Sequence, residues 1–230
     1  MRYLEIELFL KLKKEVLYVN LPEYLSKGMN YQFLSSRESK QYHHKNKIKL
    51  YNFSFLTPIE EDKVYKKDKA YTLKIRFMDL NISNIFFNSL GTIMNPYFTI
   101  LGKRYDFKEK EKEKEIRYLT TITPAIIKIK DNITLDMSTM DLNLVKERIL
   151  RNTCRKYNML NYDNIKPHDF VENVELLNSS SIGFNYKNAL VIGNKYKIKI
   201  KPDELSQEMA FVILGVGLLE KNSLAFGFCV

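Results

Sequence analysis

The chain has 230 residues, 45% of them hydrophobic, which suits one large domain or two small ones with a buried core. Its net charge of +10 favours a polyanionic partner, either nucleic acid or an anionic membrane surface, although a basic protein without such a partner would share this composition. The longest uncharged apolar stretch (209–219) falls short of the roughly 20 residues of a transmembrane helix, and Glu5 stands where a signal peptide would be apolar. We therefore expect a cytoplasmic protein without a membrane segment.

The first half of the chain predicts six elements. Apolar residues alternate along 2–10, which predicts a strand, and recur at four-residue spacing after Pro22, which predicts a helix. The remaining elements are strands at 48–56 and 71–77, a helix near 80–86, and a hairpin-like pair at 97–101 and 116–122. The alternating lysines and glutamates of 108–115 have no apolar face, so we expect a solvated hairpin tip there. The order strand, helix, strand, strand, helix, strand is the ferredoxin-like pattern.

The second half predicts another round of similar elements. They are a strand at 125–129, a long helix at 141–157, strands at 171–177, 183–186, 190–192 and 196–200, a helix at 202–214 and a final strand at 224–230. The predicted fold class is therefore α+β, with two tandem ferredoxin-like (RRM-like) domains and a glycine-containing loop before the last strand. We place the domains at 1–120, with the proposed active site, and at 121–230, with the loop.

A stripe of lysines marks the last strand before the final helix. Lys195, Lys197, Lys199 and Lys201 alternate with Tyr196 and two isoleucines. In a strand, these lysines project from one face at intervals of roughly 6.7 Å, a spacing that roughly follows successive phosphates of extended RNA. The stripe is a candidate RNA-binding surface, and the solvated face of a half-buried strand explains it equally well.

Cysteine and histidine are too sparse to indicate a metal site. Cys154 and Cys229 lie far apart in sequence, and no CxxC or HxxxH pattern is present. We expect two reduced, partly buried thiols and neither a metal nor a cofactor.

The final residues carry the most specific signal. The segment 217–230 reads GLLEKNSLAFGFCV. It resembles the glycine-rich loop and closing strand of the RAMP superfamily of CRISPR-associated RNA-binding proteins, and within it the repeat-cleaving member, the sixth numbered Cas family. Leu219 and Ala225 stand where that family usually has glycines. The resemblance implies that Lys221, Asn222 and Ser223 offer backbone and side-chain donors to RNA phosphate.

A second resemblance lies near the other end of the chain. The segment 24–31 resembles the first-helix segment that carries the active-site tyrosine of the family, which here is Tyr31. His43 and Lys49, six residues apart, resemble the histidine and lysine of the family before the following strand. His44 is the alternative histidine, because a shift of one residue in a loop is easily made. The resemblance implies an endoribonuclease that cleaves CRISPR repeat RNA.

The chemistry of these side chains suits metal-independent RNA cleavage. A 2′-hydroxyl that attacks the adjacent phosphorus leaves a 2′,3′-cyclic phosphate and a 5′-hydroxyl. His43 would serve as general acid or base, Lys49 would stabilise the developing charge, and Tyr31 would orient the nucleophile or assist as base.

Alternatives remain at each of these positions. By helical geometry Tyr31 lies off the apolar stripe, which alone favours an ordinary surface tyrosine, whereas the resemblance favours the active-site role. Lys49 heads an aromatic strand face and either snorkels or stands beside a surface on which bases stack. The alternative function is a non-catalytic RAMP-type RNA-binding subunit of a CRISPR effector complex. Whether the chain forms a homodimer or remains bound to effector subunits is left open by the sequence.

Overall fold

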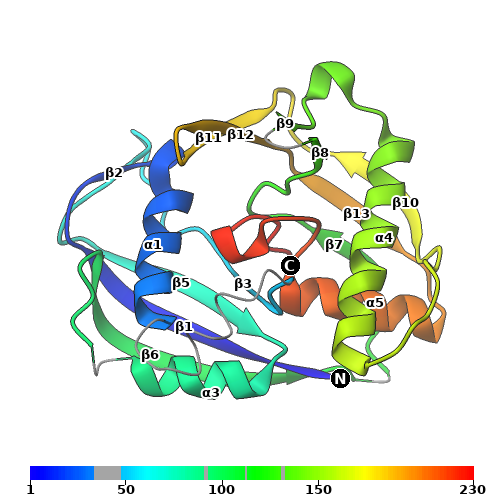
Figure 1. Cartoon of the computed structure of the whole chain (residues 1–230), viewed down its shortest axis with the longest axis horizontal. Coiled ribbons are helices and arrows are strands. Elements are labelled where there is room, and N and C mark those ends of the chain that lie inside the picture. The colour runs from blue at the N-terminus through cyan, green and yellow to red at the C-terminus, as the bar shows by residue number, and fades with distance from the viewer. Residues whose placement is uncertain (34–47, 91–92, 112, 131–132) are drawn as a thin grey trace.

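The computed structural model describes residues 1–33, 48–90, 93–111, 113–130 and 133–230, and it contains two main antiparallel sheets with helices packed against them (Figure 1). The first sheet has the strand order β3-β5-β1-β6. Its elements are β1 (Arg2–Leu12), α1 (Leu21–Phe33), β3 (Tyr51–Phe53), β5 (Ala70–Phe77), α3 (Leu80–Ser89) and β6 (Phe98–Glu109). This strand order is that of a ferredoxin-like unit, with β1 in the centre.

Alternation along β1 explains which face of the first sheet is covered. Leu4, Ile6, Leu8 and Leu10 are nearly fully buried in a core with α1 and α3. They stand opposite apolar residues of β5, because the antiparallel register pairs Leu8 with Leu73. Apolar residues on one face of β1 therefore fix both the register and the position of the two helices.

The second sheet repeats the same order. It contains β10 (Val171–Leu176), β13 (Tyr196–Ile200) and β7 (Tyr118–Thr120), and a bridge between Thr121 and Cys229 adds the C-terminal segment beside β7. Helices α4 (Leu142–Asn161) and α5 (Glu204–Val216) pack on this sheet. The α+β fold class with two tandem ferredoxin-like units is confirmed.

Two hairpins and a short strand pair complete the structure. The hairpins are β8 (Lys128–Lys130) with β9 (Ile133–Thr134), and β11 (Ile182–Tyr186) with β12 (Ala189–Gly193). The pair is β2 (Val16–Leu17) with β4 (Val64–Tyr65). Both hairpins are insertions of the second unit and lie near the top of Figure 1, beyond the end of α1.

The expected hairpin at 97–101 and 116–122 is wrong. β6 pairs with β1 and β7 pairs with β13, so the two segments belong to different sheets. β6 also continues through Glu109 with its side chains exposed from Lys103 onward, because pairing with the backbone of β1 sustains it without burial. The lysine–glutamate run therefore leads from one sheet to the other.

Two predicted strands are also shorter than expected. The strand predicted at 48–56 is reduced to β3. The one predicted at 224–230 pairs at Cys229, after a 3-10 turn (Asn222–Leu224). The predicted division between residues 120 and 121 stays a prediction; β7, just before it, lies in the second sheet.

Arg76 of β5 forms hydrogen bonds to residues of both units. Its Nε donates to Glu5 Oε2 at 2.6 Å, and its Nη1 donates to the carbonyl oxygens of Leu214 at 3.0 Å and Cys229 at 2.7 Å. The guanidinium lies 4.3 Å from the ring centre of Phe228, and only 7% of Arg76 is exposed. A buried arginine with these bonds holds the C-terminal segment against the first sheet.

Candidate nucleic-acid interface

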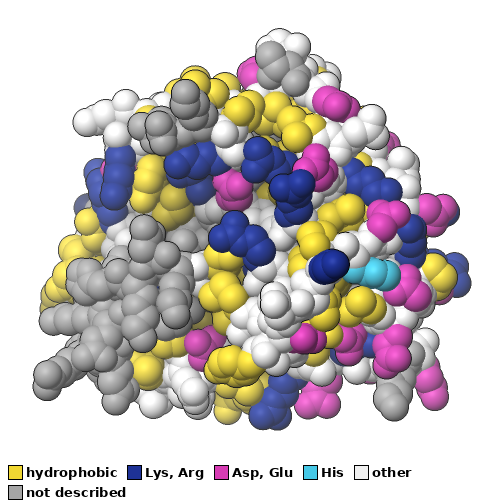
Figure 2. All heavy atoms as spheres, turned by 45° about the vertical axis from the view of Figure 1, so that its right-hand side comes forward, with side chains coloured by type: hydrophobic (Ala, Val, Ile, Leu, Met, Phe, Trp, Pro, Cys, Tyr) yellow, Lys and Arg dark blue, Asp and Glu magenta, His cyan; other side chains and the backbone are white. Residues whose placement is uncertain are grey.

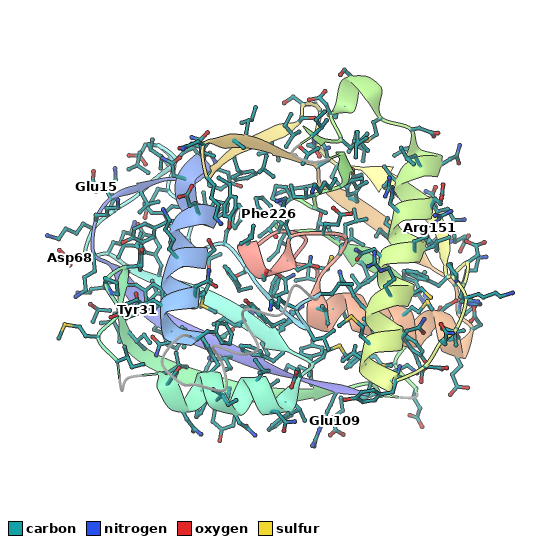
Figure 3. All side chains as sticks on the ribbon, in the orientation of Figure 1. Glu15, Tyr31, Asp68, Glu109, Arg151 and Phe226 are labelled. Atoms are coloured by element: carbon teal, nitrogen blue, oxygen red, sulfur yellow. The ribbon has the colours of Figure 1, made fainter. Side chains whose placement is uncertain are left out.

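The loop that follows α5 lies between the two units. It spans 217–227, and Figures 1 and 3 show it between α1 and α4, with Phe226 labelled within it. Phe226 is fully buried against Phe184 of β11, with ring centres 5.3 Å apart, and against Phe55 at 6.3 Å. The loop therefore joins the core of the first unit, although it belongs in sequence to the second.

Backbone conformations with positive φ recur along this loop. Five of its residues have positive φ: Gly217 (91°), Leu219 (58°), Lys221 (57°), Ala225 (69°) and Gly227 (68°). Leu219 and Ala225, which stand where the resemblance predicts glycine, occupy this region although they carry a Cβ, which costs energy. A side chain at Gly217 would collide with Asn52, and one at Gly227 with the carbonyl of Leu218. The loop keeps glycine where no space exists for a Cβ.

A buried lysine of α4 holds the loop in this conformation. Lys156 is 1% exposed, and its Nζ donates to the carbonyl oxygens of Gly217 at 2.8 Å and Leu219 at 2.7 Å and to Asn222 Oδ1 at 2.7 Å. Burial lowers the pKa of Lys156 from 10.5 to about 7. Three oxygens match the three N–H bonds of the ammonium, so the site is built to hold a proton donor.

Lys156 was not among the residues predicted from the sequence, although its position on α4 carries a signal. Val145, Ile149, Thr153 and Lys156 recur at spacings of four, four and three residues, which places all four on one helix face. All four are buried. A lysine on the core face of a predicted helix indicates a buried charge with dedicated partners.

Asn222 completes the loop from inside. Its Nδ2 donates to the carbonyls of Leu218 at 2.9 Å and Phe226 at 3.0 Å, and its Oδ1 accepts from Lys156. The side chain is 6% exposed, and its polar atoms all bond within the protein. We therefore assign Asn222 to shaping the loop. Lys221 and Ser223, the other two predicted RNA-binding residues here, are half-buried at its surface.

Two of the three proposed catalytic residues, Tyr31 and Lys49, lie on or beside neighbouring elements of the first unit. Tyr31, labelled in Figure 3 near the end of α1, is 44% exposed. Lys49 is half-buried just before β3, and burial lowers its pKa. Phe33 packs on Tyr51 with ring centres 5.1 Å apart, so the end of α1 and the start of β3 are in contact. His43 and His44 lie outside the described residues.

The aromatic face behind Lys49 is not available to bases. Tyr51 and Phe53 are 2% and 0% exposed, and Tyr51 packs on Phe77 at 5.5 Å between ring centres. Phe55 is equally enclosed, against Phe184 at 5.4 Å. The stacking alternative for this strand is therefore wrong, because both faces of the short strand are covered by the core.

The lysine stripe projects from the face of the second sheet opposite the helices, and its charge is partly compensated. Lys199 Nζ lies 2.7 Å from Glu172 Oε1, and Lys201 Nζ lies 2.6 Å from Asp169 Oδ2. Lys197 lies over the ring of Tyr118, 4.7 Å from its centre. Lys195 begins the stripe just before β13. Binding of RNA there would compete with two ion pairs, so the net positive charge of this surface is lower than the four lysines alone indicate. RNA binding by the stripe stays a prediction.

Further basic residues, not predicted from the sequence, flank the loop. Lys128 and Lys187 line a pocket with Lys221 on one side. On the other side Arg148, Arg151 and Arg155 of α4 line a groove of about 510 Å³, with Glu220 in its wall. Figure 2 shows lysine and arginine side chains gathered on this face of the molecule. The arginines recur at spacings of three and four residues, a pattern that was readable as a basic helix face.

The described residues contain neither a metal-binding cluster nor a membrane-spanning helix. They contain no group of three or more histidine, cysteine, aspartate or glutamate side chains placed to hold a metal ion. No helix in the same part of the chain has both the length and the apolar character that a membrane crossing needs. Cys154 and Cys229 are both buried and not disulfide-bonded.

The fold of two ferredoxin-like units with a loop between them is shared by several solved structures. Solved structures with this fold include "CRISPR associated protein Cas6" (TM-score 0.73, 19% identity, 99% of this chain and 98% of that one). Another is "An RAMP protein binding different RNA substrates" (TM-score 0.75, 16% identity, 98% of both chains). A third is the product of a Cas6-related gene from Pyrococcus furiosus (TM-score 0.71, 15% identity, 99% and 98%). No family model and no curated protein matches the sequence.

Proposed function

We propose that this protein is a cytoplasmic endoribonuclease that cleaves CRISPR repeat RNA without a metal ion, through attack of a 2′-hydroxyl on the adjacent phosphorus. The observation that carries the proposal is the place of the basic loop, which lies against α1 and β3, the elements next to Tyr31 and Lys49. The fold supports it, since Cas6 structures match this chain from end to end.

The proposed roles follow from the chemistry of each group. His43 is the general acid or base, since the ordinary pKa of histidine lies near neutral pH. Lys49 stabilises the charge that develops on the phosphorane oxygens. Tyr31, exposed at the end of α1, orients the nucleophilic hydroxyl by a hydrogen bond. Lys221 and the loop around it hold the phosphate backbone.

The alternative is a RAMP-type subunit that binds RNA without cutting it. One observation favours it: a neighbour with the same fold is described as a RAMP protein that binds different RNA substrates. The basic surface around the loop would serve either function, and only the set Tyr31, His43 and Lys49 would be superfluous in a scaffold.

Cleavage in excess EDTA separates the two functions. We expect the protein to cut a CRISPR repeat RNA from its own genome in EDTA and to leave a 2′,3′-cyclic phosphate. A substrate with one 2′-deoxy nucleotide just upstream of the cut removes the nucleophile, so we expect it to bind and to remain intact. Cleavage is measured on labelled RNA in denaturing gels. Tight binding of both RNAs with no cleavage of either would establish the scaffold function and remove the catalytic roles.

A further inference from the structure

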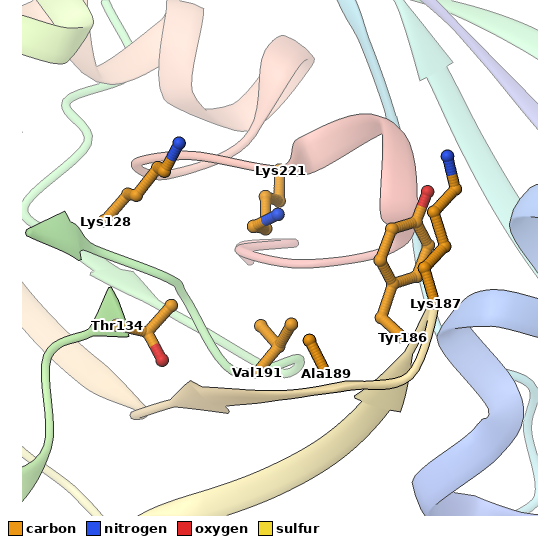
Figure 4. A pocket seen from close by; sticks show the side chains of 7 residues that line it. All are labelled: Lys128, Thr134, Tyr186, Lys187, Ala189, Val191 and Lys221. Atoms are coloured by element: carbon orange, nitrogen blue, oxygen red, sulfur yellow. The ribbon is translucent and has the colours of Figure 1, made fainter. Parts of the chain in front are cut away.

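A small pocket opens beside the loop, between the loop and the two hairpins of the second unit (Figure 4). Its volume is about 270 Å³. Its lining residues are Lys128, Thr134, Tyr186, Lys187, Ala189, Val191 and Lys221. Pockets for drug-sized ligands begin at about 300 Å³, so this one suits a group no larger than a nucleotide. Tyr31 and Lys49 do not line it.

Positive charge converges on this pocket from three separate segments. Lys128 comes from β8, Lys187 from the turn between β11 and β12, and Lys221 from the loop. No acidic residue is among the described lining residues, and none of the three lysines forms a salt bridge within the part of the chain that is described. Burial lowers the pKa of Lys221, and the charges of Lys128 and Lys187 lower it further, whereas the Glu220 carboxylate raises it. An anion between the three lysines would relieve this repulsion.

An aromatic ring stands among the lysines. Tyr186 is half-buried, and its ring centre lies 5.6 Å from Lys221 Nζ and 5.7 Å from Lys187 Nζ. Ala189 and Val191 add apolar surface to the wall. Sites for single-stranded RNA combine two features. Cationic side chains bind the phosphate, and an aromatic ring stacks on the base.

We propose that this lysine–tyrosine pocket binds one unpaired ribonucleotide of the RNA, with its phosphate between Lys128, Lys187 and Lys221 and its base against Tyr186. The inference rests on the proposed function and adds to it an anchoring point apart from the site of the chemical step. Such an anchor sets the affinity and the register of the RNA and leaves the rate of cleavage at saturation unchanged.

The charge of the pocket is tested by the salt dependence of binding. The probe is a repeat RNA with a 2′-deoxy nucleotide at the cut, and its Kd is measured by fluorescence anisotropy over a range of NaCl concentrations. We expect the double variant Lys128→Gln/Lys187→Gln to lower the salt slope by about one, the value for one lost phosphate contact. Lys67→Gln/Lys114→Gln removes the same charge from exposed positions outside the pocket and serves as the matched control.

The ring is tested separately. Tyr186→Leu is expected to weaken binding about five- to hundredfold, the usual effect of losing one stacked base, whereas Tyr186→Phe retains the affinity. Cleavage at saturating RNA should match wild type in all pocket variants.

The possible outcomes distinguish a failure of the proposed pocket from a failure of the proposed function. Wild-type protein that binds and cleaves, beside pocket variants with unchanged Kd and salt slope, overturns the pocket and leaves the proposed function standing. Loss of the saturating cleavage rate at unchanged Kd also overturns the pocket as an anchor. Wild-type protein that neither binds nor cleaves repeat RNA overturns the proposed function itself.

Discussion

Replacement of His43 by alanine is expected to lower the single-turnover rate of repeat cleavage by about 10²- to 10⁴-fold, the usual contribution of a general acid or base. RNA binding should persist, because the basic residues around the loop are unchanged. The measurement is cleavage under saturating protein, with Kd determined in parallel on the 2′-deoxy substrate. A rate that falls while Kd holds assigns His43 to the chemical step.

Two companion variants give this experiment its controls. His44→Ala tests the alternative assignment, and the double variant covers both. His168→Ala is the matched control, because His168 Nε2 lies 3.1 Å from Asp203 Oδ1 at the start of α5 and belongs to the second unit. Wild-type cleavage by His43→Ala, His44→Ala and their double variant would remove histidine from the mechanism.

Lys49→Ala should act on the same step as His43. Loss of one group that stabilises transition-state charge costs about 10²- to 10³-fold in rate. Burial lowers the pKa of Lys49, which places its ammonium in a partly desolvated environment where it acts strongly on a phosphate. The rate of Lys49→Ala, measured on the same substrate, falls below that of wild type if Lys49 faces the reacting phosphate. An unchanged rate assigns Lys49 to snorkelling at the edge of the core.

The helical period and the strand alternation of apolar residues were enough to predict most of the fold. The apolar residues of β1 and the stripe at Leu25, Met29 and Phe33 on α1 are all buried where the patterns placed them. The pairing of strands was harder to predict from the sequence. β6 is an exposed edge strand that is held by backbone hydrogen bonds to β1, and no side-chain pattern marks such a strand. The predicted hairpin at 97–122 failed for this reason.

The site was predictable only in part, because its parts come from distant segments. Lys221 was predicted from the loop motif. Lys128 and Lys187 are each more than thirty residues away from it in sequence, and only the fold of the two hairpins brings them to the same pocket. Asn222 was predicted to contact phosphate, whereas its amide bonds inside the loop. A sequence motif identifies residues that occur together, but it does not indicate which of their side chains face the ligand.

Substitution of Lys156 by methionine is expected to give the largest loss of stability among changes outside the cores of the two sheets. Methionine fills much of the same volume and leaves the carbonyls of Gly217 and Leu219 and the amide oxygen of Asn222 without their donor. Each buried acceptor that loses its partner costs about 1–3 kcal/mol, so we expect the free energy of unfolding in urea to fall by at least about 3 kcal/mol. Lys146→Met, on the same helix but in a partly exposed ion pair with Asp169, should cost no more than about 1 kcal/mol.

The pH dependence of this loss identifies the buried amine as its source. The pKa of Lys156 is about 7 in the folded chain against an ordinary value of 10.5, so between these pH values the unfolded chain binds more protons and stability rises with pH. The increase is at most about 1.4 kcal/mol for each pH unit, and it is absent below pH 7, where both states are protonated. The stability difference between wild type and Lys156→Met should therefore widen from pH 7.5 to 9.5, because all other titrating groups are common to both. A difference that stays constant over this range would show that the lysine keeps its ordinary pKa in the fold. The ammonium would then hold the loop as a permanent charge.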